Sequence, residues 1–105
     1  MGCCEHVPQA NQQGADAAGE TAAVKRKFQD FLQAATAPGA LDGKTKRAIA
    51  IALSVVTRCE PCLKSHISKA REMGFAQEEI DEAAWVGVSF GGCSAMMFYA
   101  AHGSK

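Results

Sequence analysis

The apolar residues of this chain repeat with the period of an α-helix, and in two segments they leave no polar face. Residues 44–57 read KTKRAIAIALSVVT and residues 93–102 read CSAMMFYAAH, and both are apolar on nearly every side. A helix of this kind is buried all round, but a chain of 105 residues is too small to surround two of them. The sequence therefore predicts that other copies of the chain cover part of these helices.

Three further segments favour a compact all-α bundle of about five or six helices. Residues 20–36 carry an amphipathic stripe ended by Pro38-Gly39. The stripe consists of Val24, Phe28, Phe31, Leu32 and Ala35. A third helix begins near Pro61, which suits a first turn, and ends at Gly74, which can adopt the left-handed conformation. Acidic residues from Glu78 onward favour the start of a fourth helix, and Asp42 is a suitable N-cap for the second.

Composition divides the chain into a flexible tail, residues 1–18, and one helical domain, residues 19–105. The 11 basic and 11 acidic residues balance, so the chain lacks the positive charge that nucleic acid or an anionic membrane would attract. The longest apolar run, residues 48–56, is far shorter than the roughly 18 residues of a membrane span. The N-terminus lacks the pattern of a secretory signal, so we expect a cytoplasmic protein.

The stretch RCEPCLKSH, residues 58–66, carries the chemistry that the sequence offers. Cys59 and Cys62 fall at the start of the third helix, where free amides and the helix dipole stabilise a thiolate, and Arg58 adds a cation. His66 lies four residues after Cys62, on the same helix face, where an imidazole can accept and return a proton. Thiolates of this kind are nucleophiles and metal ligands.

A Cys-x-x-Cys pair can close a disulfide over one helical turn, which permits a two-electron cycle. One thiolate attacks an oxidant or a disulfide, and the other resolves the product. We expect Cys62 to be the attacking thiol. Cys59 would then be the resolving thiol and the first sulfur to meet an external reductant.

From Leu41 to His102 the sequence resembles the carboxymuconolactone decarboxylase superfamily, and within it the alkylhydroperoxidase D-like branch. The matching stretches are LDGKTKRAIAIALSVVTRCEPCLKSH, KAREMGFAQEEIDEAAWVGVSFGG and MMFYAAH. The resemblance implies a helical homo-oligomer, a trimer or hexamer, acting as a thiol peroxidase or disulfide reductase. It implies no bound cofactor. Hydrogen peroxide, an organic hydroperoxide or a protein disulfide would be the substrate, and a thioredoxin-like or lipoyl protein would be the reductant.

One position departs from the proton relay of that branch. The resemblance implies catalytic roles for Cys59, Cys62 and His66, together with a glutamate twelve residues before the first cysteine. That position holds Arg47. A guanidinium stays charged and cannot pass a proton, so Arg47 either stabilises a thiolate or belongs to a solvated helix start, and Glu60 is a possible substitute acceptor. The cysteine pair itself argues against lactone decarboxylation, because the decarboxylase branch lacks it.

The residues also permit two other functions, a zinc site and a purely structural oligomer. In a zinc site, Cys59, Cys62 and His66 would need a fourth ligand, for which the candidates are Cys93, His102 and the cluster Cys3, Cys4 and His6. In a structural oligomer of the same fold the cysteines would be inert. We expect Cys93 to be buried in the core, with a role as a third redox partner as the alternative. We expect Trp85 in the core as well, with a place over the thiol pocket as the alternative, and residues 96–99 to fill subunit contacts.

Overall fold

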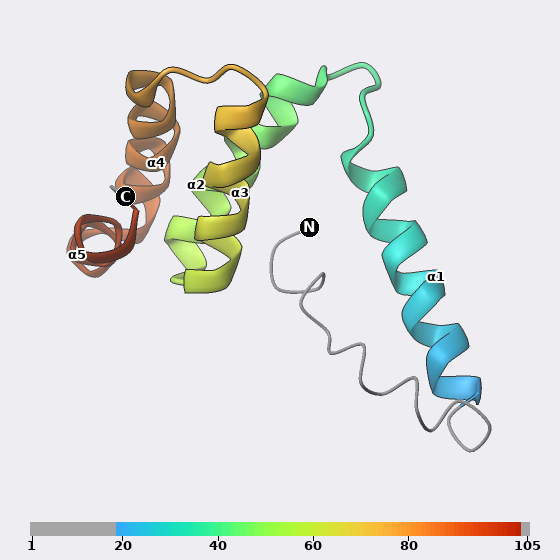
Figure 1. Cartoon of the computed structure of the whole chain (residues 1–105). Coiled ribbons are helices and arrows are strands. Elements are labelled where there is room, and N and C mark those ends of the chain that lie inside the picture. Colours follow the sequence, from blue (N-terminus) through green and yellow to red (C-terminus); the bar gives the residue numbers. More distant parts are fainter. Residues whose placement is uncertain (1–18, 104–105) are drawn as a thin grey trace.

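The computed structural model describes residues 19–103, which form five α-helices joined by short connections (Figure 1). The helices are α1 (Gly19–Thr36), α2 (Gly43–Thr57), α3 (Glu60–Glu72), α4 (Gln77–Gly91) and α5 (Cys93–His102). The predicted all-α fold is confirmed, and no strand occurs within residues 19–103. The tail predicted for residues 1–18 lies outside the described part of the chain. No helix of that part is long and apolar enough to span a membrane.

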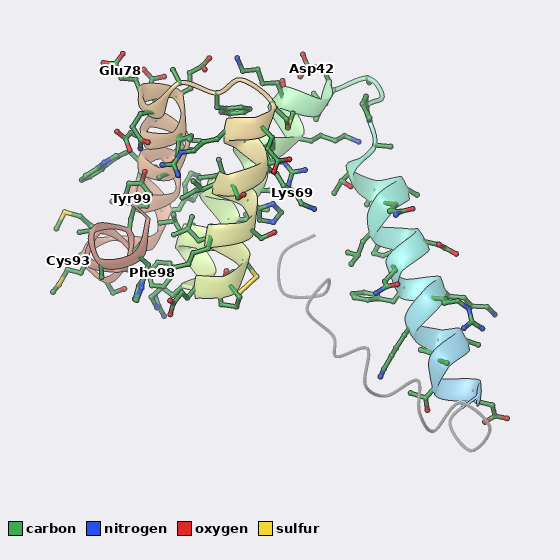
Figure 2. The ribbon with its side chains drawn as sticks, viewed as in Figure 1. Asp42, Lys69, Glu78, Cys93, Phe98 and Tyr99 are labelled. Atoms are coloured by element: carbon green, nitrogen blue, oxygen red, sulfur yellow. A yellow bond between two sulfur atoms is a disulfide. The ribbon has the colours of Figure 1, made fainter. Side chains whose placement is uncertain are left out.

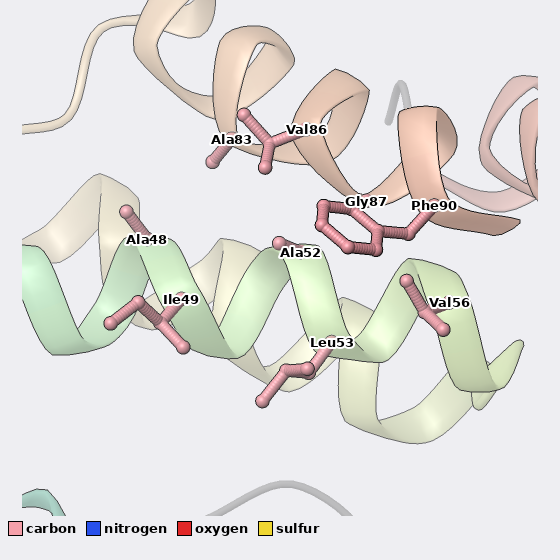
Figure 3. Close-up of a pocket in the computed structure, with 9 residues that line it drawn as sticks. All are labelled: Ala48, Ile49, Ala52, Leu53, Val56, Ala83, Val86, Gly87 and Phe90. Carbon is pink, nitrogen blue, oxygen red and sulfur yellow. The ribbon is translucent and has the colours of Figure 1, made fainter.

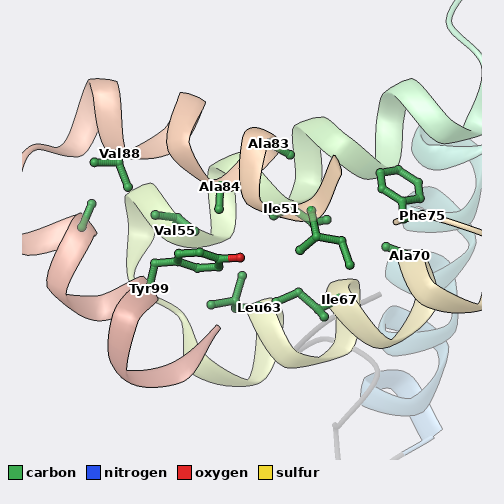
Figure 4. Packing of buried hydrophobic residues seen from close by; sticks show 12 residues of the cluster. Ile51, Val55, Leu63, Ile67, Ala70, Phe75, Ala83, Ala84, Val88 and Tyr99 are labelled. Atoms are coloured by element: carbon green, nitrogen blue, oxygen red, sulfur yellow. The ribbon is translucent and has the colours of Figure 1, made fainter. Parts of the chain in front are cut away.

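Helix α2 is the centre of the body, because it packs against both α3 and α4. Its buried face meets side chains of α3, α4 and α5 in one apolar core (Figure 4). The largest fully buried side chains are Ile51 and Val55 of α2, Leu63 of α3 and Ile80 of α4. Burying an aliphatic side chain of this size contributes about 1.5 to 3 kcal/mol. The core therefore fixes α3, which carries the cysteine pair, against α2.

The helix ends lie where the sequence signals predict them. Thr45 donates its amide to Asp42 Oδ1 at 2.7 Å, which makes Asp42 the N-cap of α2. Pro61 lies in the first turn of α3. Gly74, just after this helix, has a φ of 93°. These boundaries were predictable because each depends on residues only a few positions apart.

The turn between α2 and α3 depends on an arginine in a conformation that usually favours glycine. Arg58 has φ 54° and ψ 48° and closes the end of α2. The amide of Cys59 donates to the carbonyl of Ser54 at 3.1 Å, which satisfies a free carbonyl in the last turn of α2. This turn makes Cys59 the N-cap of α3.

Helix α1 projects from the body formed by the other four helices (Figure 1). None of its residues is buried within the described part of the chain. Lys46 of α2 holds its last turn, because the Lys46 ammonium donates to the carbonyls of Ala35 at 3.1 Å and Ala37 at 2.7 Å. The apolar stripe predicted for this helix is exposed, and Phe31 keeps 62% of its surface.

Three expectations about burial are wrong. Trp85 is 51% exposed and Cys93 is exposed as well, although both were expected in the core. Tyr99, expected at a subunit contact, is buried in the chain's own core, and its hydroxyl donates to Asp81 Oδ1 at 2.6 Å (Figures 2 and 4). Met97 is 64% exposed. On α5, which is apolar on nearly every side, the sequence pattern cannot tell the core face from the outer face.

Candidate active site

The two cysteines of the motif form a disulfide at the start of α3. The Cα atoms of Cys59 and Cys62 are 5.2 Å apart, and both residues are half-buried. The disulfide is the yellow bond at the lower, N-terminal end of α3 in Figure 2. The amide of Cys62 donates to Cys59 Sγ at 3.4 Å, so the sulfur of Cys59 serves as the N-cap acceptor of the helix.

The N-terminus of α3 supplies the site with positive potential. Free amides and the helix dipole in the first turn favour a thiolate over a thiol. The Cys62 amide donates to Cys59 Sγ, so the sulfur of Cys59 is the one that this positive potential stabilises as a thiolate. Arg58, expected as a further stabilising cation, instead donates to the hydroxyl of Ser94 in α5 at 3.0 Å.

His66 is bound to Arg47, a residue of α2. Arg47 Nη1 lies 2.6 Å from His66 Nδ1. Because a guanidinium can only donate, Nδ1 must be the acceptor, and the proton of the neutral ring is then on Nε2. Burial, and then the Arg47 cation, lower the pKa of His66 to about 4. The imidazole is therefore neutral at neutral pH, in the tautomer with Nε2–H.

Arg47 is not part of a solvated helix start, which was one of its two predicted placements. The residue is half-buried, and burial lowers the pKa of its guanidinium. Its Nε atom is buried without a hydrogen-bond partner among residues 19–103. The contact with His66 was not predictable from spacing, since 19 residues separate the two positions.

Glu60, the predicted substitute for the relay glutamate, is exposed in the first turn of α3. Its Oε2 lies 3.2 Å from Lys64 Nζ and 3.7 Å from His102 Nδ1. The carboxylate is therefore engaged on the side of α3 that faces the end of α5. Glu60 takes no part in the Arg47–His66 contact.

The described part of the chain offers no set of ligands for a metal ion. Within residues 19–103, no three side chains of His, Cys, Asp or Glu gather in a way that could hold an ion. His102 lies beside Glu60, and Cys93 is exposed at the start of α5. The remaining candidates, Cys3, Cys4 and His6, lie outside the described residues.

Comparison with known proteins assigns the family. Residues 22–102 match the model of the carboxymuconolactone decarboxylase family. The chain belongs to this family. Protein 4 of the cox locus of Paracoccus denitrificans is 40% identical over 74 residues, which are 67% of each of the two chains. A protein of Cupriavidus necator is 32% identical over 76 residues, covering 72% of this chain and 67% of its own.

Solved structures of family members have the same fold. A family protein of Legionella pneumophila superposes with a TM-score of 0.74 at 33% identity, over 96% of this chain and 90% of its own. A family protein of Thermotoga maritima gives a TM-score of 0.68 at 30% identity, over 73% of this chain and 79% of its own. A role in the antioxidative response has been suggested for the Thermotoga protein.

Proposed function

We propose that this family member is a dithiol–disulfide oxidoreductase that cycles between a Cys59–Cys62 disulfide and two thiols. The observation that carries the proposal is the disulfide at the N-terminus of α3, in which the sulfur of Cys59 accepts the Cys62 amide. A low thiol pKa and access to solvent make such a pair reactive, and both cysteines are partly exposed.

The reductive half of the cycle begins when an external thiolate attacks the sulfur of Cys62. The S–S bond breaks, and Cys59 leaves as the thiolate that the helix amide stabilises, because the better leaving thiol is the one of lower pKa. A second external thiol then displaces Cys62. Two external thiols are thereby oxidised to one disulfide, and their two protons end on the two cysteines. This order departs from the expectation that a reductant meets Cys59 first.

His66 acts in this scheme as a hydrogen-bond donor. It stands four residues after Cys62 on α3, so the two side chains share a helix face. Arg47 occupies Nδ1, and the N–H of the neutral ring is on Nε2. The neutral ring can therefore stabilise a departing thiolate through a hydrogen bond from Nε2–H, but it has no acidic proton to transfer and cannot pass a proton through Nδ1 to a carboxylate. Disulfide exchange fits this arrangement better than a reaction that needs a base.

Peroxide reduction is the second candidate, supported by the role suggested for the Thermotoga relative. The Cys62 thiolate would attack the peroxide, break the O–O bond and become a sulfenic acid, with one proton transferred to the alcohol that leaves. Cys59 would then condense with the sulfenic acid, forming the disulfide and releasing water. A cytoplasmic setting, a thiol protein as reductant and a trimer or hexamer remain part of the proposal.

Turnover with a model disulfide tests the proposal. The wild-type protein should catalyse the reduction of insulin disulfides by dithiothreitol, and Cys59→Ser and Cys62→Ser should each abolish the rate above background. Cys59→Ser should accumulate a mixed disulfide at Cys62, seen by mass spectrometry. Cys93→Ser is the matched control, because it removes an exposed thiol outside the pair. Wild-type activity in both single variants would refute the proposal, and consumption of an organic hydroperoxide measured in parallel decides between the two oxidants.

A further inference from the structure

Arg47 is a cation without a counter-ion on the helix pair that carries the disulfide. Its Nη1 contacts His66 Nδ1 at 2.6 Å, and its buried Nε has no hydrogen-bond partner within residues 19–103. In the same part of the chain it forms no ion pair with a carboxylate. A half-buried cation is costly unless an anion compensates its charge. An anion that enters from outside would therefore be bound favourably.

The contact with His66 leaves one edge of the guanidinium unused. By the covalent geometry of arginine, Nη1 lies on the side of Cδ, whereas the N–H groups of Nε and Nη2 point along another edge. Two parallel N–H groups of this kind match the two oxygens of a carboxylate. Arg47 is partly exposed, so a ligand can approach it. A carboxylate on this edge would give Nε its acceptor and leave the contact between Nη1 and His66 intact.

The face of α3 that carries Cys62 has positive potential. Cys62, His66 and Lys69 follow one another at intervals of four and three residues, so they share this face. Burial is the first cause of the lowered pKa of His66, and the cations Arg47 and Lys69 lower it further. Glu60, the acidic residue of the motif, is instead engaged on the side of α3 that faces the end of α5. A negatively charged substrate is therefore attracted toward the disulfide.

The apolar groove between α2 and α4 does not contribute to this attraction (Figure 3). Within the described residues it is lined by apolar residues only, among them Leu53 and Phe90. It lies on the side of α2 that meets α4, whereas Arg47 contacts His66 of α3. Recognition of substrate charge at the redox site therefore depends on Arg47 and the positive face of α3.

We propose that Arg47 binds a carboxylate of the substrate, so that the Cys59–Cys62 site prefers disulfides with a carboxylate a few carbon atoms from the sulfur. About 6 Å of helix axis separates Cys62 from His66, which Arg47 contacts, and a short carboxylate arm spans this distance. In the reaction, the reduced cysteine pair gives two electrons and two protons to the S–S bond of the substrate. The cysteines become the disulfide, and two carboxylate-bearing thiols leave. The inference rests on the redox function proposed above and names its substrate class.

Three small disulfides of similar length test this preference. Dithiodipropionate is negative, hydroxyethyl disulfide is neutral and cystamine is positive. Each is mixed with the reduced protein, and oxidation of the peptide that holds Cys59 and Cys62 is followed by alkylation and mass spectrometry. Dividing each rate by that of dithiothreitol with the same disulfide removes the intrinsic reactivity. Wild type should then prefer the negative over the neutral disulfide by about fivefold, with cystamine the poorest substrate.

Substitutions of Arg47 should change this order. Arg47→Met should lose the preference for the negative disulfide, Arg47→Glu should favour cystamine, and Arg47→Lys should keep the wild-type order. Because these substitutions also alter the contact with His66, the ratio between disulfides is the readout and not the absolute rate. Arg58→Met is the control, since the cation beside Cys59 donates to Ser94 instead, and it should keep the wild-type order. A wild type without the preference, or Arg47→Met with it, would overturn the proposal.

Binding of a carboxylate that cannot react separates this inference from the redox function. Suberate resembles dithiodipropionate but has carbon in place of the two sulfurs. It should shift the ring signals of His66 in NMR spectra of the oxidised wild type, and Arg47→Met should abolish this saturable shift. A protein that reduces all three disulfides without preference and ignores suberate keeps the redox function but has no carboxylate site. A protein that binds suberate through Arg47 and reduces no disulfide has the carboxylate site, but the redox function and the substrate class are then refuted.

Discussion

Replacing Arg47 should raise the pKa of His66 and change which ring nitrogen carries the proton. In Arg47→Met the stem still packs, but the cation 2.6 Å from Nδ1 is gone. In Arg47→Glu a carboxylate takes its place and favours both a charged ring and a proton on Nδ1. Nε2 of the neutral ring is then free to accept a proton, as the proton relay of the alkylhydroperoxidase D-like branch requires.

The magnitude follows from the electrostatics of a partly exposed pair. Two unit charges about 4 Å apart interact by about 1 kcal/mol in water and about 4 kcal/mol near a protein surface. Because solvent screens this partly exposed pair, we take the interaction of the Arg47 cation with a charged His66 ring as about 1 to 2 kcal/mol. This energy corresponds to a pKa change of about one. The pKa of His66, about 4 in wild type, should therefore rise by about one pH unit in Arg47→Met and about two in Arg47→Glu. Burial, the first cause of the lowered pKa, keeps the Met variant below the ordinary histidine value.

Proton NMR titration of the ring signals measures these values, with His66→Gln assigning the resonance among the three histidines. Nitrogen–proton correlation spectra report the tautomer, which should be Nε2–H in wild type. A His66 pKa that is the same in wild type and Arg47→Glu, or an Nδ1–H tautomer in wild type, would refute the reasoning.

The same pKa makes the stability of the wild-type protein depend on pH. Its value of about 4 is below the 6.5 of the unfolded chain, so the unfolded state binds more protons between these two values. The contribution of the neutral ring is therefore complete above pH 6.5 and is lost as pH falls toward 4. After allowance for partial exposure it amounts to about 1 to 2 kcal/mol. Urea denaturation of wild type and Arg47→Glu at several pH values should show a smaller loss in the variant.

Two further substitutions test the packing. Gly87→Ala should lower the free energy of unfolding by about 1 to 3 kcal/mol, because the added methyl group clashes with the carbonyl of Ala52 where α2 and α4 meet. Gly39→Ala is the control, because the space around Gly39 is open, and it should change the free energy of unfolding by less than about 0.5 kcal/mol. An equal effect of both substitutions would contradict the close approach of α4 to α2 at Gly87. Tyr99→Phe removes the hydroxyl that donates to Asp81, and urea denaturation should show a free energy of unfolding lower by about 1 kcal/mol. An unchanged urea midpoint would show that this hydrogen bond does not stabilise the fold.

The helices and their ends could be predicted because their signals are local. The stripe of α1, the Asp42 cap, the Pro61 start and the left-handed Gly74 each involve residues within a few positions. The placement of the cysteine pair at a helix start follows from the same signals. Periodicity of side chains and the chemistry of free amides determine these features without tertiary contacts.

The features that were missed depend on how the helices pack. Trp85 and Cys93 were expected in the core because they are apolar, yet both lie on the surface of a chain that leaves many large apolar side chains exposed. The contact between Arg47 and His66 joins α2 to α3, and no spacing rule reaches across two helices. The sequence identified the redox residues but not the hydrogen bond that sets the protonation of one of them.

The N-cap of α3 is itself a redox atom, and this couples helix stability to electron transfer. In the disulfide the sulfur of Cys59 is an uncharged, weak acceptor for the Cys62 amide, whereas in the reduced site it can carry a full negative charge. In the reduced site a Cys59 thiolate holds the first turn of α3 by a charge-assisted hydrogen bond, whereas in the oxidised site the disulfide joins the same turn covalently. Since Leu63 follows directly and is fully buried against the rest of the core, the oxidation state of the pair also influences how firmly α3 is anchored.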